Sequence, residues 1–195
     1  AIGIGANSAI FSVVDVFMIR PLPYPESDRL HMVWVNNPDR GFGRAAFTAP
    51  DFLDLRDQSQ SMALAATQSG VFNLSGEFEA ERLRGTYVTP GFFDVLEVQP
   101  MLGRGFTPEE GVPGNERVAV ISHELWQRRF GGDSTVVGTL INLGVEIQEE
   151  PVPSEIVGVM PPGFSYPGSG IQLWAPLALD PARTNRGSHW FTMIG

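Results

Sequence analysis

The stretch RVAVISHELWQRRFGG, residues 117–132, carries the clearest structural signals in this sequence. Its four apolar residues at 118–121 predict a buried strand, and Ser122 follows as the expected N-cap of a helix. We expect this helix to bury Trp126 on its apolar side and to end at the glycine pair that begins with Gly131. A strand that runs directly into a capped helix indicates a fold that mixes strands and helices.

Downstream of this stretch, short apolar runs alternate with glycine and proline turns. Runs of this length between turn residues are typical of strands, so the sequence from 116 to 180 is predicted to be mostly β apart from the one helix. The three runs cover residues 139–147, 155–160 and 171–177.

Upstream of residue 116, strand signals and helix signals alternate. Apolar residues with a period of two, or in short continuous runs, predict extended segments. Each of the last two strands is preceded or followed by a short helix signal, which favours two strand–helix–strand units side by side. The predicted strands are at residues 30–35, 62–72 and 82–88.

Two short helices are predicted between these strands. Thr48, with Asp51 three residues later, has the spacing of a capping box, and Phe52 and Leu55 would give the helix one apolar side. Thr89-Pro90 predicts a second helix that runs through Phe92, Phe93 and Leu96, because proline is favoured in the first turn.

Composition excludes several classes of chemistry. The formal net charge is -9 and the pI is near 4.7, which disfavours a nucleic-acid surface. The sequence contains neither cysteine nor lysine, so all 13 basic residues are arginine. A phosphate loop, a Schiff base, a thiol nucleophile and a cysteine-ligated zinc are therefore ruled out.

The first residues have the composition of a membrane segment. The run AIGIGANSAIFSVV, residues 1–14, has no ionisable side chain, but it is shorter than the roughly 20 residues that span a bilayer. It begins at Ala1 and not at methionine, and we expect it to be the second half of a spanning helix cut from a longer chain. The alternative is a buried helix of a water-soluble domain. The prolines of PLPYP, residues 21–25, end any helix there.

Three partial motifs suggest chemistry only superficially. Gly3-Ile4-Gly5 resembles the start of a dinucleotide fingerprint, but Ser8 stands at the third glycine position. His123-Glu124 lacks the second histidine of a zinc-protease helix, because residue 127 is glutamine. Ser122 follows a strand as a hydrolase serine does, yet no glycine flanks it at two residues on either side, so capping explains it.

The remaining candidates are groups of like residues. Three aspartates recur every third residue of the first predicted helix, and we interpret them as a solvated face and not as a metal patch. Glu149-Glu150 is interpreted as an exposed turn, and the tryptophans are expected in the core. The histidines are far apart in sequence. The groups are Asp51, Asp54 and Asp57; Trp34, Trp126, Trp174 and Trp190; and His31, His123 and His189.

Many segments in one order resemble a known family, the MacB/FtsX-type ABC-transporter permeases, and within it the duplicated orphan permeases. No segment is a chemical motif, and the resemblance lies in their number and order. They are GIGANSAIFSVVD, RPLPYPESDRL, PDFLDLRDQSQSM, FNLSG, ERLRGTYVTPGFFDVLEVQPMLGRGFTPEE, VISHELWQRRFGGD, IVGVMPPGF and LWAPLAL, which together cover most of residues 3–179.

The resemblance implies an α+β fold with a porter-like split β-α-β subdomain, into which a mostly-β subdomain is inserted. It implies the end of transmembrane helix 1 at residues 1–19, porter-like residues 20–115, an inserted subdomain at 116–180 and the return to the porter-like part at 181–195. A further porter segment is expected after Gly195. The sequence departs from the family at GVEIQEEPVPSE, where it carries a longer acidic insert, so the resemblance implies no strand pairing at 145–153.

The same resemblance implies a function in export. The domain would face the periplasm from the bacterial inner membrane and couple ATP hydrolysis by a separate ATPase subunit or domain to an extracytoplasmic rearrangement. The expected partners are that ATPase, a second permease copy or half, and a periplasmic adaptor, with no nucleic acid. Residues 16–22 would carry the force. The resemblance implies no catalytic residue, cofactor-binding residue or metal ligand, and no cofactor.

Two other classes of function stay open. A free-standing extracytoplasmic module could bind a sugar, peptide or lipid through its tryptophans and acidic loops. A hydrolase could use carboxylates such as Asp94 or Glu97, with their separation and a raised pKa as the test.

Overall fold

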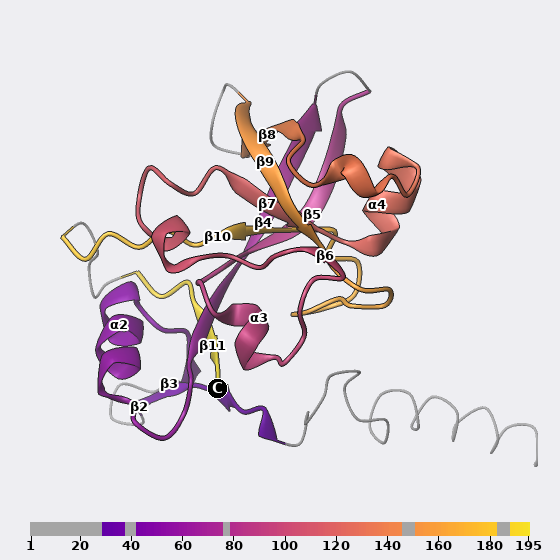
Figure 1. Cartoon of the computed structure of the whole chain (residues 1–195). Helices are drawn as coiled ribbons and strands as arrows, with labels where there is room; N and C mark the ends of the chain where they lie inside the picture. The colour runs from indigo at the N-terminus through magenta and orange to yellow at the C-terminus, as the bar shows by residue number, and fades with distance from the viewer. Residues whose placement is uncertain (1–28, 38–41, 76–78, 146–150, 183–187) are drawn as a thin grey trace, which may run out of the picture.

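The computed structural model describes residues 29–37, 42–75, 79–145, 151–182 and 188–195 (Figure 1). Its strands are β1 (Met32–Val33), β2 (Val35–Asn37), β3 (Phe42–Ala45), β4 (Ala65–Ser75), β5 (Glu81–Val88), β6 (Leu102–Gly103), β7 (Val118–Ile121), β8 (Leu140–Val145), β9 (Val152–Val159), β10 (Leu173–Pro176) and β11 (Thr192–Ile194). Its helices are α2 (Ala49–Gln58), α3 (Phe92–Val95) and α4 (His123–Phe130), with 3-10 turns η4 (Pro108–Gly111) and η5 (Ser134–Val136). This mixture of strands with few helices confirms the predicted α+β class.

Strand β4 is the longest of the described elements and belongs to two parts of the sheet. It pairs with β5 in antiparallel register from Thr67 opposite Val88 to Leu74 opposite Glu81. Its other edge is shared: the first residues pair with β11, which pairs in turn with β1, and the last residues pair with β8. One continuous strand therefore links the β1/β11 end of the molecule to the β8 end (Figure 1).

Six of the strands close into a ring. The order of hydrogen-bonded neighbours is β4, β5, β10, β7, β9 and β8, and β8 pairs again with β4. Phe72 opposite Val145 and Leu143 opposite Val152 are the pairs on either side of β8 that complete it. Each strand of the closed ring therefore pairs with two neighbours, one on either edge. The ring encloses an interior that side chains must fill.

The interior of the ring is apolar, as the alternation of strand side chains requires. Every strand of the ring contributes to one buried cluster, to which α4 adds Leu125 and Trp126. Helix α4 follows the end of β7 and covers that end of the ring. The strand members of the cluster are Phe72, Leu74, Leu83, Ala119, Ile121, Ile141, Leu143, Ile156, Val159, Leu173 and Ala175.

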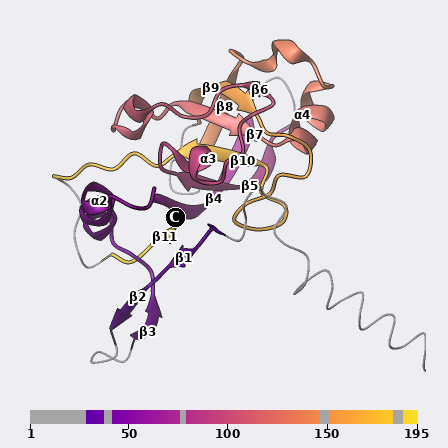
Figure 2. The same cartoon turned by 60° about the horizontal axis from the view of Figure 1, so that its bottom comes forward.

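A second cluster covers the outer face of β5, β7, β9 and β10. Trp174 lies at its centre with no exposed surface, and its indole N–H donates to the Tyr166 carbonyl at 3.0 Å. Helix α3 packs Phe92, Phe93 and Leu96 into this cluster. A third cluster lies around Phe52 of α2 and the β11 strand. Helices α2 and α4 lie on opposite sides of the molecule in both views (Figure 2).

The helix caps confirm most of the sequence predictions. Ser122 accepts the Leu125 N–H at 3.1 Å, and Gly131 ends α4 in the left-handed region with φ 63°. Thr48 accepts the Asp51 N–H at 3.3 Å at the start of α2. On the predicted apolar side of α2, Phe52 is 1% exposed and Leu55 is 41% exposed, so only Phe52 is buried.

Helix α3 begins later than predicted. The cap is Gly91, with φ 84°, and not Thr89, whose hydroxyl accepts the Ala66 N–H at 3.0 Å. The Thr89 side chain is therefore used to join the start of β4 to the end of β5. The helix retains four residues, because the chain leaves it at Glu97 with φ 54°.

The predicted strands are all present, β7 with the predicted bounds and the others with different ends. The run at 30–35 divides into β1 and β2, with Val33 and Val35 half-buried and Met32 and Trp34 exposed. In the region 145–153, Val152 pairs with Leu143 and Pro153 pairs with Asn142.

The division into subdomains at residue 116 stays a prediction. The proposals for the segments 1–19 and 16–22, for Gly3-Ile4-Gly5 and for Glu149-Glu150 lie outside the described residues. Within the described part of the chain, none of the helices has the length and hydropathy needed to cross a bilayer.

Candidate functional site

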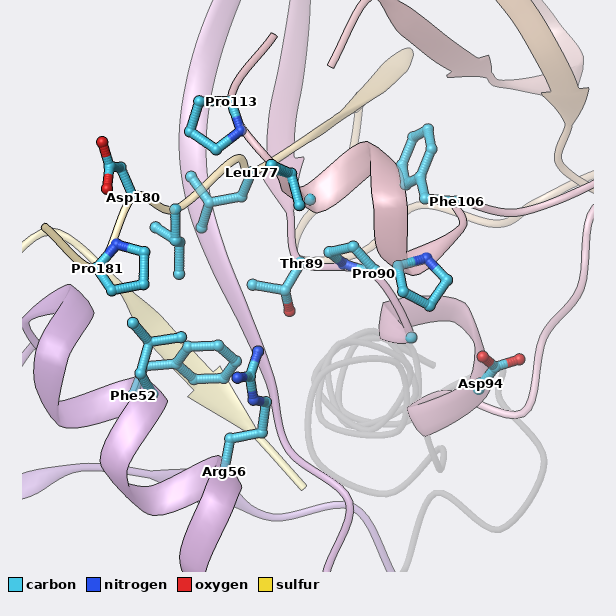
Figure 3. A pocket seen from close by; sticks show the side chains of 16 residues that line it. Phe52, Arg56, Thr89, Pro90, Asp94, Phe106, Pro113, Leu177, Asp180 and Pro181 are labelled. Carbon is cyan, nitrogen blue, oxygen red and sulfur yellow. The ribbon is translucent and has the colours of Figure 1, made fainter. Parts of the chain in front are cut away.

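A surface cleft of about 730 Å³ lies where α2 faces α3 and η4 (Figure 3). It is bordered by the segment that follows β10, so three separated parts of the sequence meet there. Its walls are mainly apolar and rich in proline. The lining residues are Phe52, Leu53, Arg56, Thr89, Pro90, Gly91, Asp94, Phe106, Pro108, Gly111, Val112, Pro113, Leu177, Leu179, Asp180 and Pro181.

Arg56, the cation among the described residues that line this cleft, is already engaged. The Arg56 guanidinium lies over the Phe52 ring, 5.8 Å from its centroid, and its Nε donates to Asp57 at 2.9 Å. Figure 3 shows the Arg56 side chain beside Phe52. Stacking and pairing together leave Arg56 as a wall of the cleft and not as a free charge.

The carboxylates of the cleft also have partners. Asp94 accepts a hydrogen bond from the Gln99 amide at 2.6 Å, and Asp180 accepts the Ala182 N–H at 2.9 Å. The Thr89 hydroxyl accepts the Ala66 N–H between β4 and the end of β5. With these polar groups occupied, the cleft is suited to packing against an apolar surface.

A charged pair fixes the loop that forms one wall of the cleft. The Arg104 guanidinium donates to both carboxylate oxygens of Glu110, at 2.8 and 3.0 Å. Glu110 also accepts the Thr107 N–H at 2.8 Å, which completes a capping box at η4. The hydrogen bond to Glu110 raises the pKa of Arg104. This pair was not predicted from the sequence, although the Thr107-to-Glu110 spacing is a capping-box signal.

The predicted candidates are dispersed and mostly structural. Asp51 accepts the Thr48 hydroxyl at 2.6 Å and Asp57 pairs with Arg56, so this side of α2 serves capping and ion pairing. His31 lies on the β1 side, and His123 contacts the Trp126 ring edge at 5.4 Å between centroids. Among the described residues, no three acidic or histidine side chains form a metal-binding group.

The tryptophan prediction is half wrong. Trp126 and Trp174 are buried, with 7% and 0% of their surface exposed. Trp34 is 39% exposed and Trp190 67% exposed, so these two are not core residues. The alternation of the 30–35 run explains the error, because it fixes two faces without showing which one is covered.

The fold is that of the extracytoplasmic domains of ABC-transporter permeases. Residues 1–194 match the family described as the MacB-like periplasmic core domain, and the chain belongs to that family. It is thus the periplasmic or extracellular domain of a MacB-like ABC-transporter permease, a family in which ATPase activity belongs to a partner subunit or domain.

Three solved structures share the fold at low sequence identity. A domain of a putative permease from Porphyromonas gingivalis matches with TM-score 0.61 and 18% identity, over 88% of this chain and 76% of its own. The extracellular domain of the noncanonic ABC-type transporter YknZ from Gram-positive bacteria matches with TM-score 0.55 and 19% identity, over 85% and 80%. The periplasmic region of MacB from Actinobacillus actinomycetemcomitans gives 0.54 and 18%, over 85% and 72%. No curated protein sequence matches the chain.

Proposed function

We propose that this domain transmits displacement from the membrane to the extracytoplasmic side of an export machine. In this mechanism a separate ATPase in the cytoplasm drives the motion, the domain faces the periplasm from the inner membrane, and a second copy or half of the permease completes the working unit. An adaptor in the periplasm would receive the motion. The domain itself would carry out no catalysis.

The observation that supports this proposal most strongly is the double pairing of β4. Its Ala65–Thr67 end pairs with β11 and through it with β1, while its Phe72–Ser75 end pairs with β8 in the ring. A displacement applied at β1 therefore reaches the ring through backbone hydrogen bonds along one strand. Coupling over such distances needs packed elements that move as a unit.

Packing between α2 and β11 adds to this rigidity. The Phe47 and Phe191 backbones exchange hydrogen bonds of 2.9 and 3.2 Å, which ties the start of α2 to the β11 strand. Phe52 of α2 is 1% exposed and packs in the same cluster as Met193. Helix α2, β11 and β4 thus form one packed block.

The experiment is a pair of spin-label distances in the whole permease, reconstituted with its ATPase. This chain has no cysteine, so introduced cysteines are its only labelling sites. Asp57→Cys and Leu140→Cys, both on exposed positions, report the distance within one domain. Leu140→Cys alone reports the distance between two copies.

We expect the distance within the domain to stay constant within about 2 Å on ATP binding, while the distance between copies changes by more than that. Deformation within the domain, with a constant distance between copies, would contradict rigid transmission. Constancy of both distances under conditions of active ATP turnover would contradict a moving domain altogether.

A further inference from the structure

The end of the six-stranded ring opposite α4 is open. A cavity of about 370 Å³ is lined there by residues from all six strands of the ring or from their immediate ends. The volume falls within the range of small-molecule sites, and the mouths of barrels are a preferred place for them. Its lining is Gln68, Phe72, Tyr87, Glu116, Arg117, Val118, Leu143, Val152, Ser154, Ala175, Pro176, Leu177 and Ala178.

Strand register places several of these side chains in the ring interior. Gln68 lies opposite Tyr87, and Tyr87 lies opposite Ala175 in the next strand, so the three share one face. This is the face of the buried interior cluster, to which Ala175 belongs and against which Tyr87 packs. Arg117 immediately precedes β7 and lies two residues before the interior residue Ala119, so the two side chains share one face of the strand.

The floor of the cavity is apolar and partly aromatic. Phe72 and Tyr87 lie with ring centroids 5.0 Å apart, and Leu143 is 6% exposed. Gly70 and Gly85 are paired across β4 and β5, and a Cβ on Gly85 would lie 2.4 Å from the Phe72 ring. The two glycines therefore leave the space that the rings occupy, and the rings are inclined to each other by 50°.

Polar groups gather at the rim of this floor. Within the described residues, no side-chain hydrogen bond or ion pair occupies the Arg117 guanidinium, the Gln68 amide or the Tyr87 hydroxyl. Burial raises the pKa of Tyr87, which keeps its hydroxyl a neutral donor. Ser154 is 7% exposed and makes one long bond of 3.4 Å to the Val152 carbonyl.

Among the described residues of the rim, Glu116 is the acid, and one of its oxygens accepts the backbone N–H of Gly114, in the turn before β7. The rim therefore presents one cation, one carboxylate held in that turn, and several neutral hydrogen-bonding groups above an aromatic floor. Arg117 would repel a cationic ligand, and a peptide of several residues would be larger than the 370 Å³ cavity.

We propose that the open end of the ring binds a small carboxylate with an aromatic body. The body would lie on Phe72 and Tyr87, and the carboxylate would accept hydrogen bonds from Arg117, with Gln68 or Tyr87 as the second donor. This goes beyond force transmission, because it gives the domain a ligand of its own.

The test is a titration of the 195-residue chain with 2-naphthoate, followed by amide NMR shifts. The neutral 2-naphthamide, of almost the same shape, is the matched ligand. We expect saturable shifts at Gln68, Tyr87 and Ala175, with a dissociation constant on the order of a millimolar or below. Naphthamide is expected to bind the same residues more weakly.

Two arginine variants separate charge recognition from nonspecific attraction. Arg117→Gln is expected to weaken naphthoate binding about tenfold and to leave naphthamide within about a factor of two. Arg44→Gln, at an exposed position on β3 outside this cavity, is expected to leave both ligands unchanged. Both positions are exposed, so both variants should fold.

Three outcomes would overturn the proposal. One is the absence of saturable shifts at the ring residues up to about ten times the expected dissociation constant. Another is binding that shifts Thr89 and Gly111 of the larger cleft instead. The third is an equal loss of naphthoate affinity in Arg117→Gln and Arg44→Gln, which would show that the affinity depends only on the net charge of the domain.

Discussion

The backbones of His31 and Gly195 hydrogen-bond to each other in both directions, with His31 N–H donating at 2.8 Å and Gly195 N–H at 3.1 Å. This reciprocal pair stands next to the β1/β11 ladder, in which Met32 lies opposite Ile194. The two ends of the described domain are therefore held side by side, at the end of the sheet that β4 connects to the ring.

A disulfide should form readily between these strands. Because His31 and Gly195 are a hydrogen-bonded pair, Met32 and Ile194 are a non-hydrogen-bonded pair, whose Cα atoms lie about 4.5 Å apart. Oxidised Met32→Cys/Ile194→Cys is expected to form the bond and to raise the urea midpoint of unfolding. Mass spectrometry and denaturation measure the two effects.

The control is Met32→Cys/Met193→Cys, in which the second cysteine lies on the opposite face of β11. It should remain reduced under the same oxidation. Equal crosslinking of both pairs would show that the register of β1 against β11 is different.

Gly85→Ala should be strongly destabilising. The added Cβ would lie 2.4 Å from the Phe72 ring and 2.7 Å from the Leu173 carbonyl oxygen, and a backbone atom of a paired strand cannot move aside as the end of a flexible side chain can. We expect a loss of about 2–3 kcal/mol in the free energy of unfolding, measured in urea. Gly168→Ala, where nothing lies within 4 Å, should change it by less than about 0.5 kcal/mol. Similar effects at both sites would contradict the close packing of the ring.

The Glu81 pair should make stability depend on pH. The Arg128 hydrogen bond, at 2.7 Å, lowers the pKa of Glu81 below its ordinary 4.5. The contribution is thus complete above about pH 4.5 and is lost as the pH falls through the lower folded value. Since Arg128 is 50% exposed, it amounts to less than about 1 kcal/mol.

Urea unfolding at pH 6 and at pH 3 measures this contribution. Arg128→Gln should be destabilising at pH 6 and show a smaller penalty at pH 3, while Arg44→Gln should show no such difference between the two pH values. A penalty of the same size at both pH values would argue against an ionic origin.

Trp174→Phe should cost about 2–3 kcal/mol, because it removes the buried indole and leaves the Tyr166 carbonyl without its donor. Trp190→Phe, at a position 67% exposed, should change stability by less than about 0.5 kcal/mol. Thermal and urea denaturation of the two variants test this, and a larger effect at Trp190 would show that its surface is covered.

Local signals predicted the elements well. Ser122, Gly131 and Thr48 act through contacts within a few residues of themselves, so their roles can be inferred from the sequence around them. The start of α3 was misplaced for the opposite reason. Thr89 bonds to Ala66, 23 residues away, and that partner is invisible in the local pattern.

The closure of the ring and both cavities depend on longer separations. Phe72 pairs with Val145, and Gly85 with Leu173, across gaps that no periodicity reveals. Trp34 and Trp174 have equally apolar neighbours in sequence, yet one is 39% exposed and the other fully buried. Which face of a strand is covered is decided by elements elsewhere in the chain.

The ring also sets an order for folding during synthesis. Strand β10 lies between β5 and β7, although it is the last of the six to be made. Until residue 176 has left the ribosome, β5 and β7 each lack a neighbour, and the interior stays open to water. Pairing over such separations is slow, because loop-closure entropy must be lost before contacts form. A nascent chain that stops short of β10 therefore presents an open sheet to chaperones and proteases, and the ring is complete only when most of the domain has been translated.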